Sequence, residues 1–528
     1  MKSKKLIALV LTVMMVVSVL SACGKTQDPP VSGNTAAANP SSTATTPSST
    51  TSGPDISKPV KLKWMYIGNT VTDDTKVMEG LNAYLKDKIN ASLEMTWCGW
   101  GADFDDRVML AIQTAEDYDI YFTCSWTSNN FAIESKKGSY AKLDDLLTQY
   151  TPNLFKELHP VLTEAAKTEG PDGKIATYAI PSYKEIAQVY TWDLNMNMLE
   201  KYGFSEKDVT NYYELGPIFE KIKAGEGKDF YPFNYETGVT ERVVNNNDIV
   251  DSELLLSYEF DPANPGKSGT KIVSKYETEG YEKFVKQSRE YYLKGYIDPQ
   301  MSNVKASMSV RENANLNAKY AIGVQSYSPG YEYENSDLRK TKVVYKKTHT
   351  PLIGTTSSRG AMNAISVNSK NPDRALMLLN LVNTDPKVYS FLAYGAEGVH
   401  YKTQADGSVL LDPVMQDTFR VWRAGLGKLT ILPRMSTEPE NIWNLFDEFN
   451  NGAQALPILG WSFDPKPVAT ELAALNSIKE EYAISLNCGA ADPAAKLPEF
   501  ISKLKANGID SVVAEAQKQL DAYLASKK

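Results

Sequence analysis

The stretch between residues 60 and 126 alternates between two hydrophobic periods. Large apolar side chains recur at every second position from Val60 to Tyr66 and at every fourth position from Val77 to Ile89. The same alternation repeats once more and ends in a short apolar run, so the order is strand, helix, strand, helix, strand. This order predicts the start of a parallel, doubly wound α/β sheet. The predicted strands are 60–66, 93–97 and 119–122, and the predicted helices are 77–89 and 104–115.

Polar and aromatic side chains follow each of these strands. Ligands of parallel sheets sit beyond the carboxyl ends of the strands, so these side chains are candidate ligand contacts. Trp126 offers a flat indole face to the C–H groups of a pyranose, unless it belongs to the core. The amides of Asn129 and Asn130 suit vicinal hydroxyls, although Asx residues in turns equally bond their own backbone. The remaining candidates at this edge are Asn69, Trp100 and Asp74, of which Asp74 is equally explained as a helix cap.

Later segments continue the α/β pattern. Residues 319–324 read as a strand that ends in a Pro-Gly turn carrying Tyr327, a further candidate contact. Residues 361–367 read as another strand, and Asn371 and Pro372 then open a helix as its N-cap and first-turn proline. A last amphipathic helix is predicted over 509–524. The tryptophans at 192, 422 and 443 fit a core position equally well.

Composition excludes several classes of function. The 528 residues are too many for one hydrophobic core, so we expect at least two domains. A net charge of −8 leaves no basic footprint for nucleic acid. The three histidines and four cysteines lack metal or triad spacing, and no phosphate-binding loop or nucleophile elbow occurs. The sequence therefore indicates no cofactor and no metal site.

The N-terminus has the parts of a secretory signal peptide: basic residues at positions 2, 4 and 5, an apolar run over 6–20, and small residues before Cys23. Cys23 resembles the acylated cysteine of a bacterial lipobox, and two acyl chains hold a protein on a membrane better than one. The alternative is an ordinary secreted protein in which Cys23 is incidental. Residues 24–58 are rich in Thr, Ser and Pro and predict a disordered tether. We therefore expect a protein anchored by lipid at the extracellular face of the membrane.

Four stretches, taken in their order and spacing with the lipobox, resemble one family. The stretches are Tyr118–Trp126 with Gly138–Leu146, Asp172–Pro181 with Asp193–Gly203, Asn371–Leu376 with Asn383–Gly398, and Phe463–Tyr523. With these residues the chain is similar to the bacterial extracellular solute-binding proteins of ABC importers, in the carbohydrate branch related to maltose-binding protein. The last stretch looks like the C-terminal module of a lipoprotein sub-branch of that family.

The resemblance implies a two-lobed, periplasmic-binding-protein-like clamp of class α/β. Each lobe would be a mostly parallel sheet with flanking helices, joined by a hinge that the chain crosses near 181–188, 306–318 and 350–359. The implied division is a signal peptide over 1–22, a lipidated cysteine and tether over 23–58, and a first lobe of 59–184 with 319–355. The second lobe would be 185–318 with 356–457, and residues 458–528 would form a module that completes the second lobe and the hinge.

The same resemblance implies the function. We expect a monomer that captures an oligosaccharide between its lobes and delivers it to the permease subunits of an ABC importer, without covalent chemistry. In addition to the contacts above, Asn234, Tyr235, Arg359 and Trp461 are implied cleft or hinge groups. Two alternatives stay open: a surface enzyme acting on glycans, which would need two carboxylates about 5 to 10 Å apart, and a binding or sensor protein for a non-sugar ligand such as a peptide.

Overall fold

The computed structural model describes residues 55–69, 71–236, 238–245, 256–258 and 270–527. The predicted signal peptide, Cys23 and all of the predicted tether before residue 55 lie outside these ranges. Within them, no helix combines the length and the apolar character that crossing a membrane requires.

The first lobe is built on a five-stranded sheet of order β2-β1-β3-β14-β6. The three strands predicted at the start of the chain are confirmed, and β1 runs parallel to both β2 and β3. β14 is antiparallel to its two neighbours, so the sheet is mixed. The strands are β1 (Val60–Ile67), β2 (Ala91–Cys98), β3 (Ile120–Thr123), β6 (Ala179–Pro181) and β14 (Met362–Ile365).

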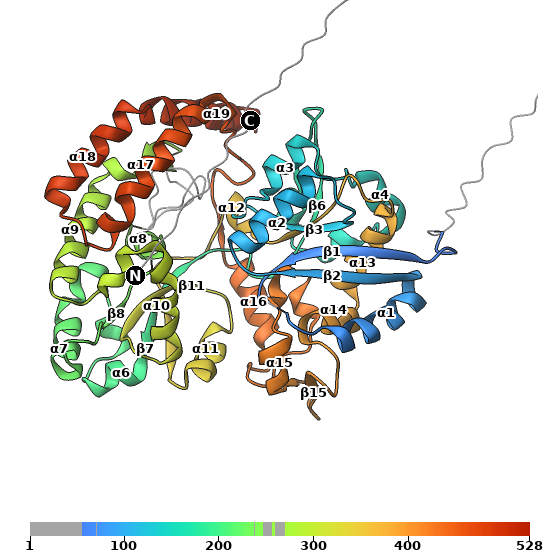
Figure 1. Cartoon of the computed structure of the whole chain (residues 1–528), viewed down its shortest axis with the longest axis horizontal. Coiled ribbons are helices and arrows are strands. Elements are labelled where there is room, and N and C mark those ends of the chain that lie inside the picture. The colour runs from blue at the N-terminus through green and yellow to red at the C-terminus, as the bar shows by residue number, and fades with distance from the viewer. Residues whose placement is uncertain (1–54, 70, 237, 246–255, 259–269, 528) are drawn as a thin grey trace, which may run out of the picture. The chain divides into compact units, whose positions relative to one another are not determined.

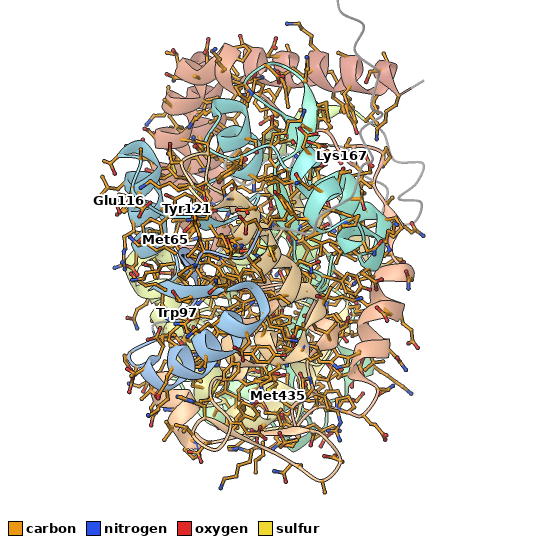
Figure 2. All side chains as sticks on the ribbon, turned by 90° about the vertical axis from the view of Figure 1, so that its right-hand side faces the viewer. Met65, Trp97, Glu116, Tyr121, Lys167 and Met435 are labelled. Atoms are coloured by element: carbon orange, nitrogen blue, oxygen red, sulfur yellow. The ribbon has the colours of Figure 1, made fainter. Side chains whose placement is uncertain are left out.

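Helices pack on this sheet through apolar side chains. In α1 (Thr75–Ile89), the buried residues recur at the predicted every-fourth spacing from Val77 to Ile89. Met65 of β1 lies opposite Tyr121 of β3, and both are buried in the first core (Figure 2). The other helices of this lobe are α2 (Ala102–Gln113), α3 (Phe131–Lys137), α4 (Asp144–Tyr150), α5 (Pro160–Ala165), α13 (Pro372–Thr384), α14 (Pro386–Tyr394), α15 (Pro413–Thr418) and α16 (Ile442–Asn451). The lobe also contains two small antiparallel pairs of strands: β4 (Lys167–Glu169) with β5 (Ile175–Thr177), and β15 (Tyr401–Thr403) with β16 (Val409–Leu411).

The second lobe is built on a four-stranded sheet of order β12-β7-β11-β8. β11 and β12 run in the same direction on either side of β7, which runs opposite to both, and only β8 is parallel to its neighbour. The expectation of a mostly parallel sheet is therefore wrong for this lobe. The strands are β7 (Tyr190–Asn195), β8 (Phe233–Asn234), β11 (Ile322–Ser326) and β12 (Val343–Lys347), with β9 (Leu256–Tyr258) and β10 (Ile272–Ser274) as a separate pair.

The C-terminal helices share the core of the second lobe. Figure 1 shows α17 and α18 beside α9, and side chains from residue 456 to residue 520 are buried with those of β7 and α7. The predicted last helix is confirmed as α19. The helices of this lobe are α6 (Met196–Lys201), α7 (Gly216–Glu226), α8 (Val239–Asn245), α9 (Glu279–Leu293), α10 (Val304–Leu316), α11 (Tyr331–Arg339), α17 (Ala469–Asn487), α18 (Pro493–Ala506) and α19 (Ile509–Ser526).

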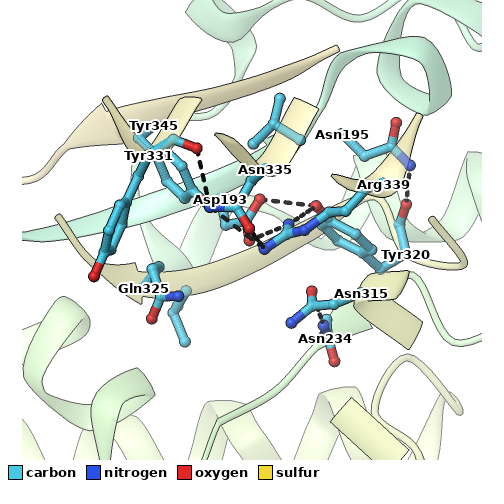
Figure 3. A network of polar contacts seen from close by, with 12 residues as sticks. Asp193, Asn195, Asn234, Asn315, Tyr320, Gln325, Tyr331, Asn335, Arg339 and Tyr345 are labelled. Carbon is cyan, nitrogen blue, oxygen red and sulfur yellow. Dashed lines mark hydrogen bonds and ion pairs between the residues drawn. The ribbon is translucent and has the colours of Figure 1, made fainter. Parts of the chain in front are cut away.

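A buried polar network ties this second sheet together (Figure 3). Arg339, at the end of α11, donates to Asp193 of β7 at 2.7 Å, and both side chains are at most 3% exposed. Tyr320 donates to the other oxygen of Asp193 at 2.8 Å and accepts from Arg339. Asn335 accepts from the same guanidinium at 3.0 Å. Each of these buried polar side chains has a hydrogen-bond partner, so the network does not cost stability. It holds α11 on the sheet.

The predicted division of the middle of the chain is wrong. Residues 319–355 were expected in the first lobe, but β11 and β12 pair with β7 in the second sheet. Residues 356–457 were expected in the second lobe, but β14 pairs with β3, and residues from 361 to 446 fill the first core. The expected crossing at 306–318 does not exist, because α10 and β11 belong to the same lobe.

In the part of the chain that the structure describes, three segments connect the lobes: 182–189, 348–361, and the stretch between α16 and residue 456. The first two coincide with predicted crossings. Main-chain bonds join all three, since Gln188 and Leu352 exchange two hydrogen bonds of 2.7 and 2.9 Å, and β13 (Leu352–Ile353) pairs with β17 (Gln454–Ala455). Apolar side chains including Tyr183, Ile186 and Phe449 pack beneath them.

Candidate ligand-binding site

A cavity of about 320 Å³ lies against the connecting segments. Its lining combines residues of both lobes, so it is the place where a ligand could touch both at once. Trp126 and Trp422 come from the first lobe, and Arg242, Ser326 and Tyr327 from the second. The connecting segments contribute Lys184, Glu185, Ala187, Gln188, Thr356, Ser357 and Gly360.

Three indoles form one wall, which we call the tryptophan wall: Trp100, Trp126 and Trp422. The ring centroid of Trp100 lies 6.2 Å from that of Trp126 and 5.2 Å from that of Trp422, and Trp126 and Trp422 are 6.2 Å apart. Phe122 of β3 packs behind Trp126 and Trp422. Trp100 is 45% exposed and Trp126 39% exposed, which is unusual for side chains of this size.

The polar atoms of two of these indoles are already bonded. Trp126 Nε1 donates to the main-chain oxygen of Gly360 at 2.7 Å, and Trp100 Nε1 donates to Asn69 Oδ1 at 3.1 Å. The rings are thereby held in one orientation and present mainly their faces. The wall is preorganised for contact with an apolar surface.

Trp422 is held through close packing. The hydroxyl of Tyr66 donates to its main-chain oxygen at 2.6 Å, and burial raises the pKa of Tyr66 well above its usual value. Glycines leave room for the indole: a Cβ at Gly425 would come within 2.6 Å of the Trp422 ring, and one at Gly68, whose φ is +150°, within 3.3 Å of its Cβ. A side chain at either glycine would displace the wall.

The remaining lining is polar. Lys184 Nζ lies 2.5 Å from Glu185 Oε1, and Ser328 donates to the other Glu185 oxygen at 3.0 Å. Arg242 and Gln188 both donate to the hydroxyl of Tyr190, at 2.7 and 2.8 Å.

Tyr327 borders the cavity beside Phe449, with the ammonium of Lys347 4.5 Å from its ring centroid. Burial raises the pKa of the Tyr327 phenol, so it stays a neutral donor and acceptor. An aromatic wall opposite hydroxyl, amide and charged groups fits a ligand with one apolar face and many hydroxyls. Within the described ranges, no cluster of His, Cys, Asp and Glu side chains could hold a metal ion.

Four of the residues predicted from sequence come together at this site. Trp126 and Tyr327 line the cavity, and Trp100 joins it through the tryptophan wall. Asn69 touches it only through its bond to Trp100, as a positioning group. Ligand contact by any of them stays a prediction.

The other predicted residues of the first lobe have structural roles. Asn129 is fully buried, donating to the Phe122 oxygen at 2.8 Å and accepting from Tyr140. Asn130 caps α3 through bonds to the main chain of Ala132 and Ile133. Asp74 accepts from Trp97 Nε1 at 2.8 Å, and its side chain does not cap α1. Asn129 and Asn130 share a cause, because Asx side chains after a strand serve the local main chain, whereas Asp74 is engaged by the indole of Trp97.

Of the residues implied by the family resemblance as cleft or hinge groups, none lines the cavity, and Arg359 lies in the connection between the lobes. Asn234, the last residue of β8, donates to Asn315 of α10 at 2.8 Å (Figure 3), and Tyr235 is fully buried in the second core. Trp461 is 6% exposed in the same core. Arg359 is 4% exposed and bonds protein oxygens, so it belongs to the connection between the lobes and not to the cavity surface.

Most residues of the cavity lining were not predicted from the sequence. Trp422 follows no strand, and only its partners in space reveal its role. Lys184, Glu185 and Gln188 fall within the predicted crossing at 181–188, which was a usable signal because a hinge segment borders the space between lobes. Ser326 carried the same signal as its neighbour Tyr327, the end of a predicted strand, and Arg242 carried neither signal.

Comparisons with known proteins agree with this architecture. Residues 457–525 match a family described as a domain of unknown function (DUF3502). Over 480 residues the chain is 27% identical to a carbohydrate ABC transporter substrate-binding protein of Streptococcus pneumoniae, covering 89% of this chain and 92% of that relative. The crystal structure of the N-glycan transport solute binding protein NgtS from S. pneumoniae superposes with a TM-score of 0.74 at 24% identity, covering 89% of this chain and 100% of that one. Its complex with Man5GlcNAc gives a TM-score of 0.71 at 25% identity, over 89% of this chain and 100% of that one. The resemblance to carbohydrate substrate-binding proteins is thus confirmed, without its lipoprotein detail: the chain is a homologue of a carbohydrate ABC transporter substrate-binding protein and has the periplasmic-binding-protein-like fold.

Proposed function

We propose that the protein captures an oligosaccharide in the cavity beside the tryptophan wall and delivers it to the permease of an ABC importer. The observation that carries this proposal is the pairing of Trp126 and Trp422 with a polar lining from the connecting segments and the second lobe. Sugar rings have apolar faces and hydroxyl rims, so they match both surfaces. The homologue NgtS, whose crystal structures include complexes with Man1GlcNAc and Man5GlcNAc, adds support.

A lipid anchor at Cys23 places the protein at the extracellular face of the membrane. Support for the anchor comes from the sequence, in the basic start, the apolar run and the cysteine that follows it. The Thr-, Ser- and Pro-rich residues 24–54 then let the folded lobes reach both the ligand and the permease. The main-chain oxygens of Asp55 and Ile56 are already bonded to the first lobe, by Arg374 and Asn90.

Binding without chemistry is favoured over glycan hydrolysis by the charges at the cavity. Among its described lining residues, Glu185 is the one carboxylate, and both of its oxygens are engaged, by Lys184 and by Ser328. Hydrolysis needs a second carboxylate about 5 to 10 Å away, one of the two serving as a proton donor.

A glycan panel tests the proposal. The mature chain is incubated with neutral and acidic oligosaccharides, with Man1GlcNAc and Man5GlcNAc among them, and thermal shift, calorimetry and chromatography of the glycans are recorded together. We expect at least one glycan to bind and to be recovered intact. Recovery of shortened glycans would support the alternative of a glycan-hydrolysing enzyme. If no glycan binds but a peptide does, the proposal that the ligand is an oligosaccharide is overturned.

A further inference from the structure

Residues 458–464, which we call the strap, open the C-terminal segment that matches the domain of unknown function. Helix α19 holds the strap from one side. The amide of Gln519 donates to the main-chain oxygen of Asp464 at 3.0 Å and accepts from its N–H at 2.8 Å. The hydroxyl of Tyr523 donates to the main-chain oxygen of Leu459 at 2.5 Å. The strap therefore moves with α19.

The other side of the strap contacts the first lobe and the connecting segment. Asp464 pairs with Lys136 of α3 at 3.0 Å. The Ser462 hydroxyl accepts from Arg359 Nη1 at 2.8 Å. The Ser462 side chain is exposed and does not belong to the core.

Arg359 is a buried cation that bonds neutral oxygens. Besides Ser462, its guanidinium donates to the main-chain oxygens of Ala165 at 3.0 Å and Lys167 at 2.7 Å. Burial lowers the pKa of Arg359 to about 10, which leaves it charged at neutral pH. A buried charge is costly unless its donors are all bonded, so the Ser462 oxygen is one of three acceptors that hold this side chain in place.

The main chain around Arg359 is bonded to Ser125 and Trp126, and Trp126 belongs to the tryptophan wall. Ser125 N–H donates to the Arg359 oxygen at 3.0 Å, and the Ser125 hydroxyl donates to the Thr356 oxygen at 2.8 Å. The Gly360 oxygen accepts from Trp126 Nε1 at 2.7 Å. Thr356 and Gly360 themselves line the cavity. A shift of Arg359 would therefore displace Trp126 and the cavity edge together.

We propose that the strap is a positioning element of the ligand site: through the Ser462–Arg359 bond, the C-terminal segment fixes where Trp126 stands in the cavity. This inference rests on the proposed function for its effect on affinity, but not for its effect on the geometry of the indoles. Arg359 and Ser462 are positioning residues, since neither lines the cavity.

Variants of the strap test the proposal. Ser462→Ala removes the acceptor, and Ser462→Thr keeps it. Gln519→Ala removes the two bonds between α19 and the main chain of Asp464, near Ser462 in the sequence, and leaves the Tyr523 bond to Leu459. The matched control is Gln517→Ala, on the same helix, because Gln517 makes an equivalent pair of bonds to the main chain at Ile272 and Thr270, away from the strap.

Two readouts are measured on each variant of the full chain. The exciton band in circular dichroism reports the mutual orientation of the close indoles and needs no ligand; its assignment is fixed with Trp126→Phe. Titration with Man5GlcNAc, or with the best glycan of the panel, reports affinity. Ser462→Ala and Gln519→Ala should alter the exciton band and weaken binding about fivefold, the equivalent of one ordinary hydrogen bond. Ser462→Thr and Gln517→Ala should leave both readouts as in the wild type.

The outcomes separate the two proposals. An unchanged exciton band in Ser462→Ala and Gln519→Ala overturns the proposed role of the strap, whatever the glycan results. An equal change in Gln517→Ala also overturns it, because loosening of the whole helix would then be the cause. A changed band in a protein that binds no glycan supports the strap and refutes the proposed function.

Discussion

Replacing Trp126 by alanine should weaken oligosaccharide binding and leave the protein folded. The indole is 39% exposed, so its loss leaves a smaller cavity than the loss of a core tryptophan, which costs about 3–5 kcal/mol of folding free energy. What the fold loses is the hydrogen bond to Gly360 and the contacts with Trp100 and Trp422. Together these are worth about 2 kcal/mol.

The loss in binding follows from stacking. By analogy with bases stacked on aromatic side chains, one ring contributes about 1–3 kcal/mol to the free energy of binding. Removing Trp126 should therefore raise the Kd of the glycan about 5- to 150-fold. Trp126→Phe keeps an aromatic face but loses the bond to Gly360, so its Kd should lie between those of the wild type and the alanine variant.

Trp443 provides the matched control. It is also half-buried, its Nε1 also donates to a main-chain oxygen, that of Leu432 at 2.9 Å, and it also packs on an aromatic ring, Phe446, at 5.7 Å. It does not line the cavity. Calorimetric titration and a thermal melt are recorded on Trp126→Ala and Trp443→Ala. The control should melt earlier and bind normally. Wild-type affinity in Trp126→Ala, or an equal loss of affinity in the control, would refute the reasoning.

Four further predictions concern the anchor, the second sheet, the strap and the lobes. Cys23→Ala should move the protein from the membrane fraction to the medium without changing its Kd. Arg339→Met leaves Asp193 buried and unpaired, so urea unfolding should show a loss of about 3–5 kcal/mol, and a loss below about 1 kcal/mol would contradict the network. Burial opposes ionisation of Asp464, but the bonds from Lys136 and from the Lys466 N–H, with the charges of both lysines, together hold its pKa below its usual 3.8. The stabilisation is present above that value and is lost as the pH falls, so the Tm advantage of the wild type over Asp464→Asn should vanish in acid. Saturating glycan should reduce the radius of gyration in solution scattering, and an unchanged radius would argue against closure.

The sequence predicted elements well where the pattern is local. Apolar residues at every second position located β1, and apolar residues at every fourth position located α1. Each element buries one face, and the geometry of a strand or a helix sets how often a residue returns to that face. The helix start at Pro372 was also readable, because proline suits the first turn and not the interior. Trp126 was found by topology alone: it follows a buried strand at the edge where such sheets bind ligands.

Sheet membership could not be read in the same way. β11 and β14 are both short, apolar and buried, and nothing in either strand says which sheet it completes. That is decided by pairing with β7 and β3, far away in the sequence, and by the connecting segments that carry the chain across. The exchange of 319–355 and 356–457 between lobes was an error of this kind. Asn129 failed for another reason, because a buried amide can serve the backbone as well as a ligand.

The two walls of the cavity make complementary demands on a ligand. The indole N–H groups of Trp100 and Trp126 are occupied by Asn69 and Gly360, so the tryptophan wall has faces to offer but few hydrogen bonds. A stacked sugar must take its hydrogen bonds from the connecting segments and from the second lobe, where Gln188 and Tyr327 stand. Neither wall alone satisfies both the apolar face and the hydroxyls. The free energy of binding is therefore largest when both lobes touch the sugar together, which gives a physical reason for the ligand to favour the closed arrangement.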